Sequence, residues 1–172
     1  GSIPDHKIPP EGREIVCPKC KSAFFVQRQE APEHAAQDAV VHYKEGVKLF
    51  KNHQIDAAIE KFNLAIQADP QYGEAYRYLG LAYGQKGLWA EASQVFQQAL
   101  TYQPDDVRSL KNLGVAYLHQ KKFAEAEHVF REVLQKTPGD EKAESYLVMA
   151  AQGEQQQHAA AIAQEPATVA ES

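Results

Sequence analysis

The sequence lacks the features that mark membrane proteins, disulfide-rich proteins and nucleic-acid coats. Only two of its 172 residues are cysteines, too few for a disulfide framework, and they read as reduced thiols of a cytoplasmic protein. Its apolar runs are only a few residues long, so we expect no membrane span. Its formal net charge of −5 argues against broad contact with a phosphate backbone. What remains is a globular protein, with 44% hydrophobic and 24% charged residues.

Patterns of catalytic residues are also missing. We find no glycine-rich phosphate loop, no His-x-x-x-His pair and no convincing Ser/His/Asp set, and the seven histidines are scattered. We therefore predict that the protein is not an enzyme and that these 172 residues bind no cofactor. Gly1 and Ser2 are typical of a cloning remnant, so we expect the native chain to start upstream, where a targeting segment would change the compartment.

A repeat of 34 residues dominates the rest of the chain. Glycine, alanine, phenylalanine and proline each recur with the same period and phase, which chance does not explain. The four series are Gly46, Gly80 and Gly114; Ala58, Ala92 and Ala126; Phe62, Phe96 and Phe130; and Pro70, Pro104 and Pro138. They predict three units, over residues 39–72, 73–106 and 107–140.

Each unit contains two stretches with helical periodicity. In the second unit these are residues 74–86 and 89–102, with a turn near Gly87 between them. Pro104 ends the second stretch, because proline has no N–H to donate and disfavours helix just before it. Small residues such as Gly80 and Ala92 are expected where the two helices of a unit approach closely.

Two short motifs give the repeat a family likeness. Leu79-Gly80-x-x-Tyr83 and Leu113-Gly114-x-x-Tyr117, each followed by the alanine, phenylalanine and proline of its unit, resemble the tetratricopeptide repeat family. The resemblance implies an all-α, right-handed superhelical solenoid of antiparallel helix pairs with a concave groove. We expect residues 141–164 to form a capping helix and residues 165–172 to be disordered.

The resemblance also implies a function. In this family the first helix of each unit lines the groove, and the groove binds protein partners. The groove residues predicted here are Tyr43, Val47, Phe50, Arg77, Leu81, Arg108, Lys111, Val115 and His119. They form an apolar surface with a basic stripe, which suits a peptide or partner segment with acidic and apolar residues. We therefore predict a scaffold or adaptor for protein–protein interaction; an ordinary solvated face is the alternative.

One subfamily binds the C-terminal carboxylate of chaperones through a clamp of Lys, Asn, Asn, Lys and Arg. The corresponding positions here are Tyr43, Val47, Tyr78, Arg108 and Asn112. Only Arg108 keeps the required chemistry, so we do not expect this chain to bind chaperone tails by that clamp.

Residues 1–38 do not fit the repeat, apart from the start of a lead-in helix expected from Pro32. Within residues 15–26, Cys17-Pro18-Lys19-Cys20 resembles the second half of a short prokaryotic zinc ribbon, which points to a bacterial source. Structural zinc needs four ligands, so the two cysteines are a half-site whose partners would lie upstream, or else two free thiols. The alternative function is therefore a zinc-ribbon regulatory or nucleic-acid-associated protein in which the repeats mediate self-association.

Overall fold

The computed structural model describes residues 13–16, 23–26 and 32–164, and the chain divides into two compact units, residues 1–37 and 38–172. Within residues 1–37, strand β1 (Arg13–Val16) pairs with strand β2 (Ala23–Val26) in an antiparallel hairpin, with Val16 opposite Ala23. Cys17 and Cys20 fall between the two strands in sequence but outside the described residues, as does the tail that was predicted to be disordered, residues 165–172.

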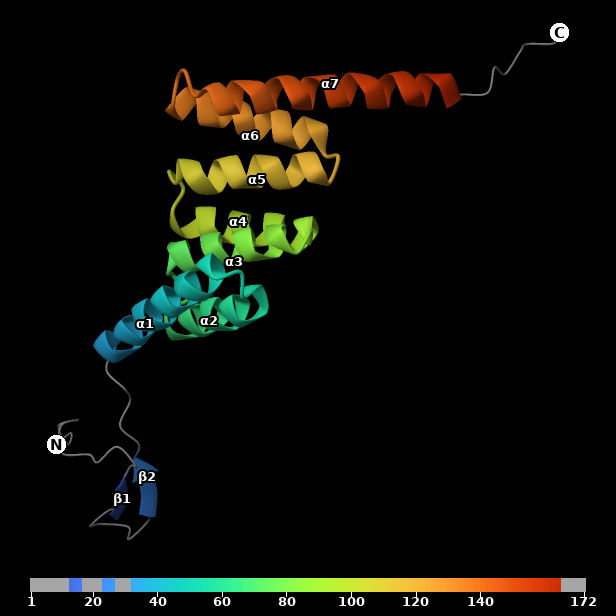
Figure 1. Ribbon diagram of the computed structural model, residues 1–172. Helices are drawn as coiled ribbons and strands as arrows, with labels where there is room; N and C mark the ends of the chain where they lie inside the picture. The colour runs from blue at the N-terminus through green and yellow to red at the C-terminus, as the bar shows by residue number, and fades with distance from the viewer. Residues whose placement is uncertain (1–12, 17–22, 27–31, 165–172) are drawn as a thin grey trace. The chain divides into compact units, whose positions relative to one another are not determined.

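Seven helices follow in the described chain, and from residue 38 onward they form a stack of antiparallel helices (Figure 1). The helices are α1 (Pro32–Lys51), α2 (Ile55–Ala68), α3 (Gly73–Gln85), α4 (Trp89–Tyr102), α5 (Val107–His119), α6 (Phe123–Lys136) and α7 (Glu141–Gln164). The predicted all-α solenoid is thus confirmed for this part of the chain. The helix bounds of the second repeat, predicted at 74–86 and 89–102, differ from the observed ones by one residue at each end of α3 and agree for α4.

Local chemistry explains where these helices begin and end. Asp106 caps α5, where its carboxylate accepts hydrogen bonds from the backbone N–H groups of Arg108 and Ser109. Gly87 turns the chain between α3 and α4 with φ of +74°, a left-handed conformation that glycine adopts without steric cost. Helix α4 ends at Tyr102, before Pro104, as expected for a residue that cannot continue a helix.

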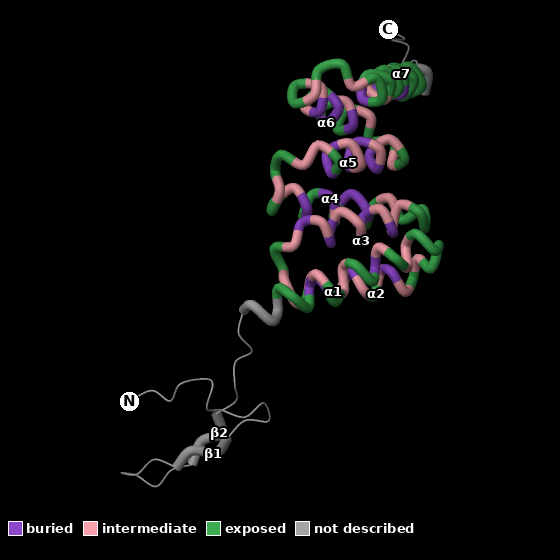
Figure 2. The backbone as a smooth tube through the Cα atoms, turned by 60° about the vertical axis from the view of Figure 1, so that its left-hand side comes forward, coloured by how far each residue is buried: buried purple, intermediate pink, exposed green. Residues whose placement is uncertain are grey.

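The repeating glycines make the same close contact in every repeat. A Cβ atom built on Gly46, Gly80 or Gly114 would lie 2.6 Å from the ring of the phenylalanine sixteen residues later. Those rings, Phe62, Phe96 and Phe130, are almost fully buried. The purple segments of Figure 2 show that such buried residues lie where neighbouring helices face each other. From the sequence we expected these glycines to allow two helix backbones to approach closely. In the structure the glycine instead makes room for an aromatic ring of the second helix.

Helix α7 begins like the first helix of a fourth repeat and then departs from the pattern. Ala143 and Ala150 are buried, and Asp140 accepts a hydrogen bond from the backbone N–H of Ala143. Val148, however, stands where the three repeats have glycine, and its side chain is 54% exposed. No aromatic ring could approach a valine there as closely as Phe62 approaches Gly46, so α7 does not offer the close contact that the first helix of each repeat makes.

The glycine at position 153 does not interrupt α7. Glycine normally weakens a helix interior. Instead the helix runs on to Gln164, and Gly153 is buried because the ring of Phe123 packs against its backbone. Glycine is thus used for close approach at this position as well.

Candidate functional site

The first helices of the three repeats, α1, α3 and α5, carry the residues that were predicted to form a groove. At the start of the array, Tyr43, Val47 and Phe50 are half-buried and pack against the core around Phe62. Further along, Leu81 of α3 and Val115 of α5 line one pocket together. Val115 also lines a second pocket with His119, so the predicted surface contains two adjoining apolar depressions.

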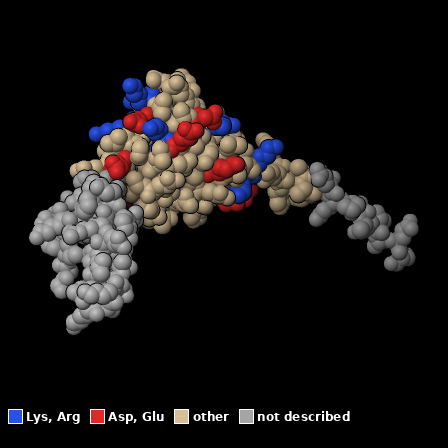
Figure 3. All heavy atoms as spheres, turned by 90° about the horizontal axis from the view of Figure 1, so that it is seen from below, with Lys and Arg blue, Asp and Glu red and all other residues tan. Residues whose placement is uncertain are grey.

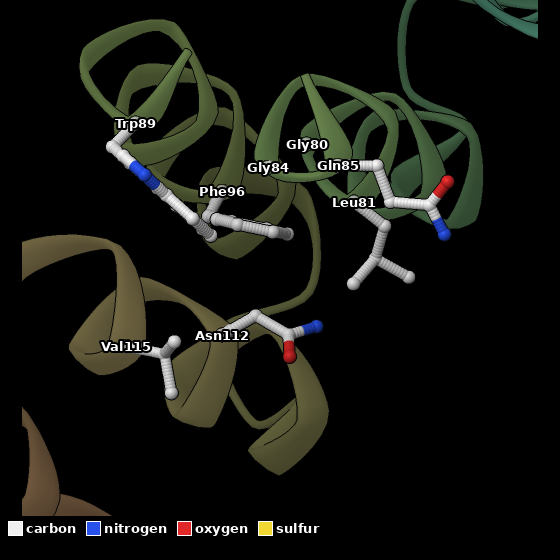
Figure 4. A pocket seen from close by; sticks show the side chains of 8 residues that line it. All are labelled: Gly80, Leu81, Gly84, Gln85, Trp89, Phe96, Asn112 and Val115. Atoms are coloured by element: carbon white, nitrogen blue, oxygen red, sulfur yellow. The ribbon is translucent and has the colours of Figure 1, made fainter. Parts of the chain in front are cut away.

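We call the first depression the Gly84 pocket. It has a volume of about 350 Å³ and lies between α3, α4 and α5. Figure 4 shows Trp89 and Phe96 of α4 on one side, Leu81 and Gln85 of α3 beside them, and Asn112 and Val115 of α5 across the opening. Its eight lining residues are Gly80, Leu81, Gly84, Gln85, Trp89, Phe96, Asn112 and Val115. The polar side-chain groups among them are the amides of Gln85 and Asn112 and the indole N–H of Trp89.

A break in the repeat creates this pocket. In the first repeat Phe50 contacts Tyr78 of the next repeat edge-to-face, with ring centroids 6.1 Å apart. The residues that occupy these two positions one repeat later are Gly84 and Asn112, both of which line the pocket. Because Gly84 has no side chain, the space that a phenylalanine fills between α1 and α3 is left open between α3 and α5.

The third equivalent position is intermediate. Leu118 and Tyr146 occupy it, and they line the second pocket together with Val115, His119, Phe123 and Met149. That pocket is smaller, about 240 Å³. The larger of the two pockets therefore lies at the glycine, and the smaller one lies at the leucine.

Trp89 forms a wall of the Gly84 pocket. Its indole stacks on the imidazole of His119, with ring centroids 3.8 Å apart and planes 3° from parallel. A Cβ atom on Gly84 would lie 3.1 Å from Cζ3 of the indole, so the ring leans over the glycine. Trp89 therefore borders the open space of the pocket.

The basic stripe predicted on the groove is largely paired within the chain. Nε of Arg77 lies 3.4 Å from the carboxylate of Asp106, and Nζ of Lys111 lies 2.7 Å from that of Asp140. Both pairs join residues 29 positions apart, from one first helix to the cap of the next. In the first repeat the equivalent residues, Tyr43 and Tyr72, make an edge-to-face aromatic contact at 5.1 Å.

These contacts change the charge that the surface presents. Burial raises the pKa of Tyr43 to about 12, so its hydroxyl stays neutral at physiological pH. The carboxylate of Asp140 has a lowered pKa because it accepts a hydrogen bond from Lys111, and it therefore balances that lysine. Arg108 is exposed and makes no ion pair with any residue that the structure describes. In the view of Figure 3 acidic and basic side chains are intermingled.

The other sequence predictions for this region can be placed briefly. No cluster of three or more histidine, cysteine, aspartate or glutamate side chains that could hold a metal ion occurs within residues 13–16, 23–26 and 32–164. None of the described helices is long and apolar enough to cross a membrane. The groove set predicted from the sequence lacks Trp89 and Asn112. The signal that could have found them is Gly84, which stands at the position held by Phe50 and Leu118 in the other repeats.

Helix pairs that stack in register, with a groove along their first helices, define the class of helical-repeat solenoids. Comparison with known families makes this specific. Residues 80–141 match the family described as "Tetratricopeptide repeat", and residues 46–87 match "TPR repeat". The repeat region of this chain therefore belongs to the tetratricopeptide repeat family.

Similar proteins share this region. "Cellulose synthase 2 operon protein C" of Komagataeibacter xylinus is 34% identical over 83 residues, which are 48% of this chain but only 6% of that protein. Among solved structures, the first TPR of Spaghetti (RPAP3), bound to the HSP90 peptide SRMEEVD, has a TM-score of 0.68 at 24% identity. That match covers 70% of this chain and 95% of the other.

Two further structures are similar. The second TPR domain of human RPAP3, in complex with the HSP70 peptide SGPTIEEVD, has a TM-score of 0.64 at 24% identity, covering 70% of this chain and 98% of that one. The MamA protein has a TM-score of 0.56 at 27% identity, covering 59% of this chain and 55% of that one. At such identities the RPAP3 domains establish the shared fold.

Proposed function

We propose that this protein is a non-catalytic scaffold that binds an extended peptide or partner segment along α3, α5 and α7. The observation that carries the proposal is the pair of adjoining apolar pockets on these helices, with Val115 shared between them. Concave, mostly apolar sites with a few polar groups are the usual form of a ligand-binding surface. Structural neighbours that bind peptides on the same fold support this interpretation.

The chemistry of the surface indicates the kind of segment that it binds. Leu81, Val115 and the neighbouring aromatic rings favour apolar side chains, and the exposed guanidinium of Arg108 favours a carboxylate. Arg77 and Lys111 contribute less to the charge of the groove than the sequence predicted, because Asp106 and Asp140 pair with them. The proposed partner is therefore mainly apolar, with an acidic group near Arg108.

The chaperone tails bound by the RPAP3 domains are not the proposed ligands. Four of the five clamp positions here do not carry the required residue. Tyr43 stands in place of lysine, Val47 and Tyr78 stand in place of asparagine, and Asn112 stands in place of arginine. Tyr43, Val47 and Tyr78 instead pack against the cluster around Phe62. The neighbours support the mode of binding, a peptide along the groove, and this chain supplies different recognition chemistry.

Selection from a random dodecapeptide library displayed on phage tests the proposed function. We expect the wild-type protein to recover peptides rich in apolar residues with at least one acidic residue. Their affinity should fall at least fivefold with Arg108→Glu, because the charge reversal opposes the acidic group. Arg131→Glu on the exposed face of α6 is the matched control and should leave binding unchanged. Recovery of no peptides, or equal effects of both substitutions, would contradict groove binding.

We infer that Cys17 and Cys20 form a zinc half-site, a property separate from peptide binding. The support is that these thiols fall between two paired strands, β1 and β2, where the resemblance to a zinc ribbon places a metal knuckle. Two thiolates would supply half of the tetrahedral ligand set that structural zinc needs. We expect residues 1–172 alone to bind no stoichiometric zinc in a chelator competition assay, and a longer native chain with a second cysteine pair to bind one.

A further inference from the structure

We propose that the Gly84 pocket is an anchor site for one bulky apolar side chain, of the size of phenylalanine or leucine, that is followed or preceded by an acidic residue in the bound peptide. This inference rests on the proposed function and specifies the ligand for the middle of the groove. The pocket lies between α3, α4 and α5, and Asn112 of α5 is one of its lining residues. Arg108 lies one helical turn before Asn112 in the same helix.

The repeat itself shows what the pocket accepts. Between α1 and α3, the side chain of Phe50 fills the space next to Tyr78. At the equivalent place between α3 and α5, Gly84 supplies no side chain, and the space next to Asn112 is open. An aromatic side chain from a partner would therefore occupy the position that the chain's own Phe50 occupies one repeat earlier. The partner completes a packing pattern that the sequence leaves unfilled.

The size and lining of the pocket agree with this occupant. A dry cavity of about 150 Å³ is enough to bind benzene, and the Gly84 pocket measures about 350 Å³. It offers the indole of Trp89, the ring of Phe96 and the aliphatic side chains of Leu81 and Val115. The amides of Gln85 and Asn112 provide hydrogen-bonding groups for the backbone of the bound segment without adding charge inside.

Charge selects the neighbouring residue. Arg77 and Lys111 already face Asp106 and Asp140, whereas Arg108 is exposed and unpaired among the described residues. Residues four apart on a helix lie on the same face, so the guanidinium of Arg108 reaches the same surface as Asn112. A carboxylate next to the anchoring side chain would meet Arg108, a groove cation that makes no ion pair among the described residues.

The pocket contains its own reporter. Trp89 is the only tryptophan of the protein, and its indole forms a wall of the pocket. Entry of an apolar side chain removes water from the indole, so its fluorescence reports occupancy directly. Amide resonances of Gly84, Asn112 and Val115 provide an independent readout that does not depend on the indole.

The test uses two small probes, acetyl-Asp-Phe-amide and acetyl-Asp-Ala-amide, titrated into the full chain. We expect the phenylalanine probe to shift the Trp89 emission and the amide resonances around the pocket, and to bind at least tenfold more tightly than the alanine probe, because only it buries a large side chain. Gly84→Leu, which copies Leu118 of the next repeat, should weaken the phenylalanine probe at least tenfold. Gln98→Leu, on the exposed face of α4, is the matched control and should not.

A second variant and the display experiment keep the test decisive. If Gly84→Leu unfolds, Val115→Phe narrows the pocket from α5 and should have the same effect. Equal binding of both probes, or resonance shifts away from the pocket, would overturn the anchor site. If displayed peptides bind in an Arg108-dependent way but Gly84→Leu leaves their affinity unchanged, the anchor site is wrong and groove binding stands. If no peptide is recovered and neither probe binds, both proposals are wrong.

Discussion

Replacing Gly80 with alanine should cost stability, although alanine is the better helix former. Gly80 is buried in α3, and a Cβ atom there would lie 2.6 Å from Cε1, 2.8 Å from Cδ1 and 2.8 Å from Cζ of Phe96. Carbon atoms pack favourably at about 3.5–4.0 Å, so the ring must move by most of an ångström. Phe96 is only 3% exposed and has little room to do so.

Two opposing contributions set the size of the effect. Overpacking a well-filled core costs about 1–3 kcal/mol, whereas glycine to alanine in a helix interior contributes about 1 kcal/mol in the opposite direction. The free energy of unfolding should therefore fall by roughly 0–2 kcal/mol. Gly84→Ala, four residues on in the same helix, is the matched control. Its Cβ would lie 3.1 Å from Cζ3 of Trp89 and at ordinary van der Waals distances of 3.7 and 3.8 Å from two further ring atoms, beside the open pocket, so it should be neutral or stabilising.

Urea unfolding followed by circular dichroism measures both variants. We expect Gly80→Ala to be about 1–3 kcal/mol less stable than Gly84→Ala, since the helix-propensity gain is common to both. Phe96→Leu removes the ring edge, so Gly80→Ala should cost much less in that background. If Gly80→Ala is as stable as Gly84→Ala, or if the cost persists without the Phe96 ring, then close approach to the ring does not explain the glycine.

The helix caps and α7 provide three more predictions. Asp106→Ala should lower the free energy of unfolding by about 1–2 kcal/mol, the usual value of an N-cap, whereas Asp105→Ala should have little effect because Asp105 makes only an exposed ion pair with Lys136; parallel urea titrations compare the two. Because Lys111 lowers the pKa of Asp140 below its ordinary 3.8, its ionised form stabilises the folded state above that pH. The advantage of wild type over Asp140→Asn, which keeps a capping side chain, should therefore be full at neutral pH and disappear as the pH falls through the lowered pKa; an advantage that grows with acidity would contradict the ion pair. Gly153→Ala should loosen the second half of α7 from Phe123. Amide hydrogen exchange should then be faster in that half of α7 than in wild type, with little change in α3. Equal exchange rates of wild type and variant in α7 would argue against the contact.

Much of the fold could be predicted because its pattern is local and periodic. Glycine, alanine, phenylalanine and proline at one spacing placed the helix pairs, since each repeat packs only on its neighbours. Caps were readable as well: Asp106 and Asp140 precede helices and accept hydrogen bonds from their first turns. The capping helix was predicted over residues 141–164, and α7 runs from Glu141 to Gln164. The sequence did not reveal the contact between Gly153 and the ring of Phe123, because the two residues are thirty positions apart.

The charge of the groove could not be obtained in the same way. From the sequence we predicted Arg77 and Lys111 on the surface that faces a partner, with both charges free to bind that partner. Each is matched by an aspartate 29 positions later, at the cap of the following helix. Side chains this far apart meet only because consecutive repeats stack in one register, and a helical pattern within a single repeat carries no information about that register.

The sequence by itself thus determined the order of the helices, where they end and the family resemblance. The residues responsible act on their own turn or on the adjacent helix, so their effects are visible in the sequence. The anchor pocket was not determined in this way, although its cause is one glycine. A missing side chain becomes a binding site only if nothing else fills the space, and this depends on where Trp89 stacks, on how closely α5 approaches α3 and on which charges are already paired. Those are properties of packed neighbours, and only the folded chain decides them.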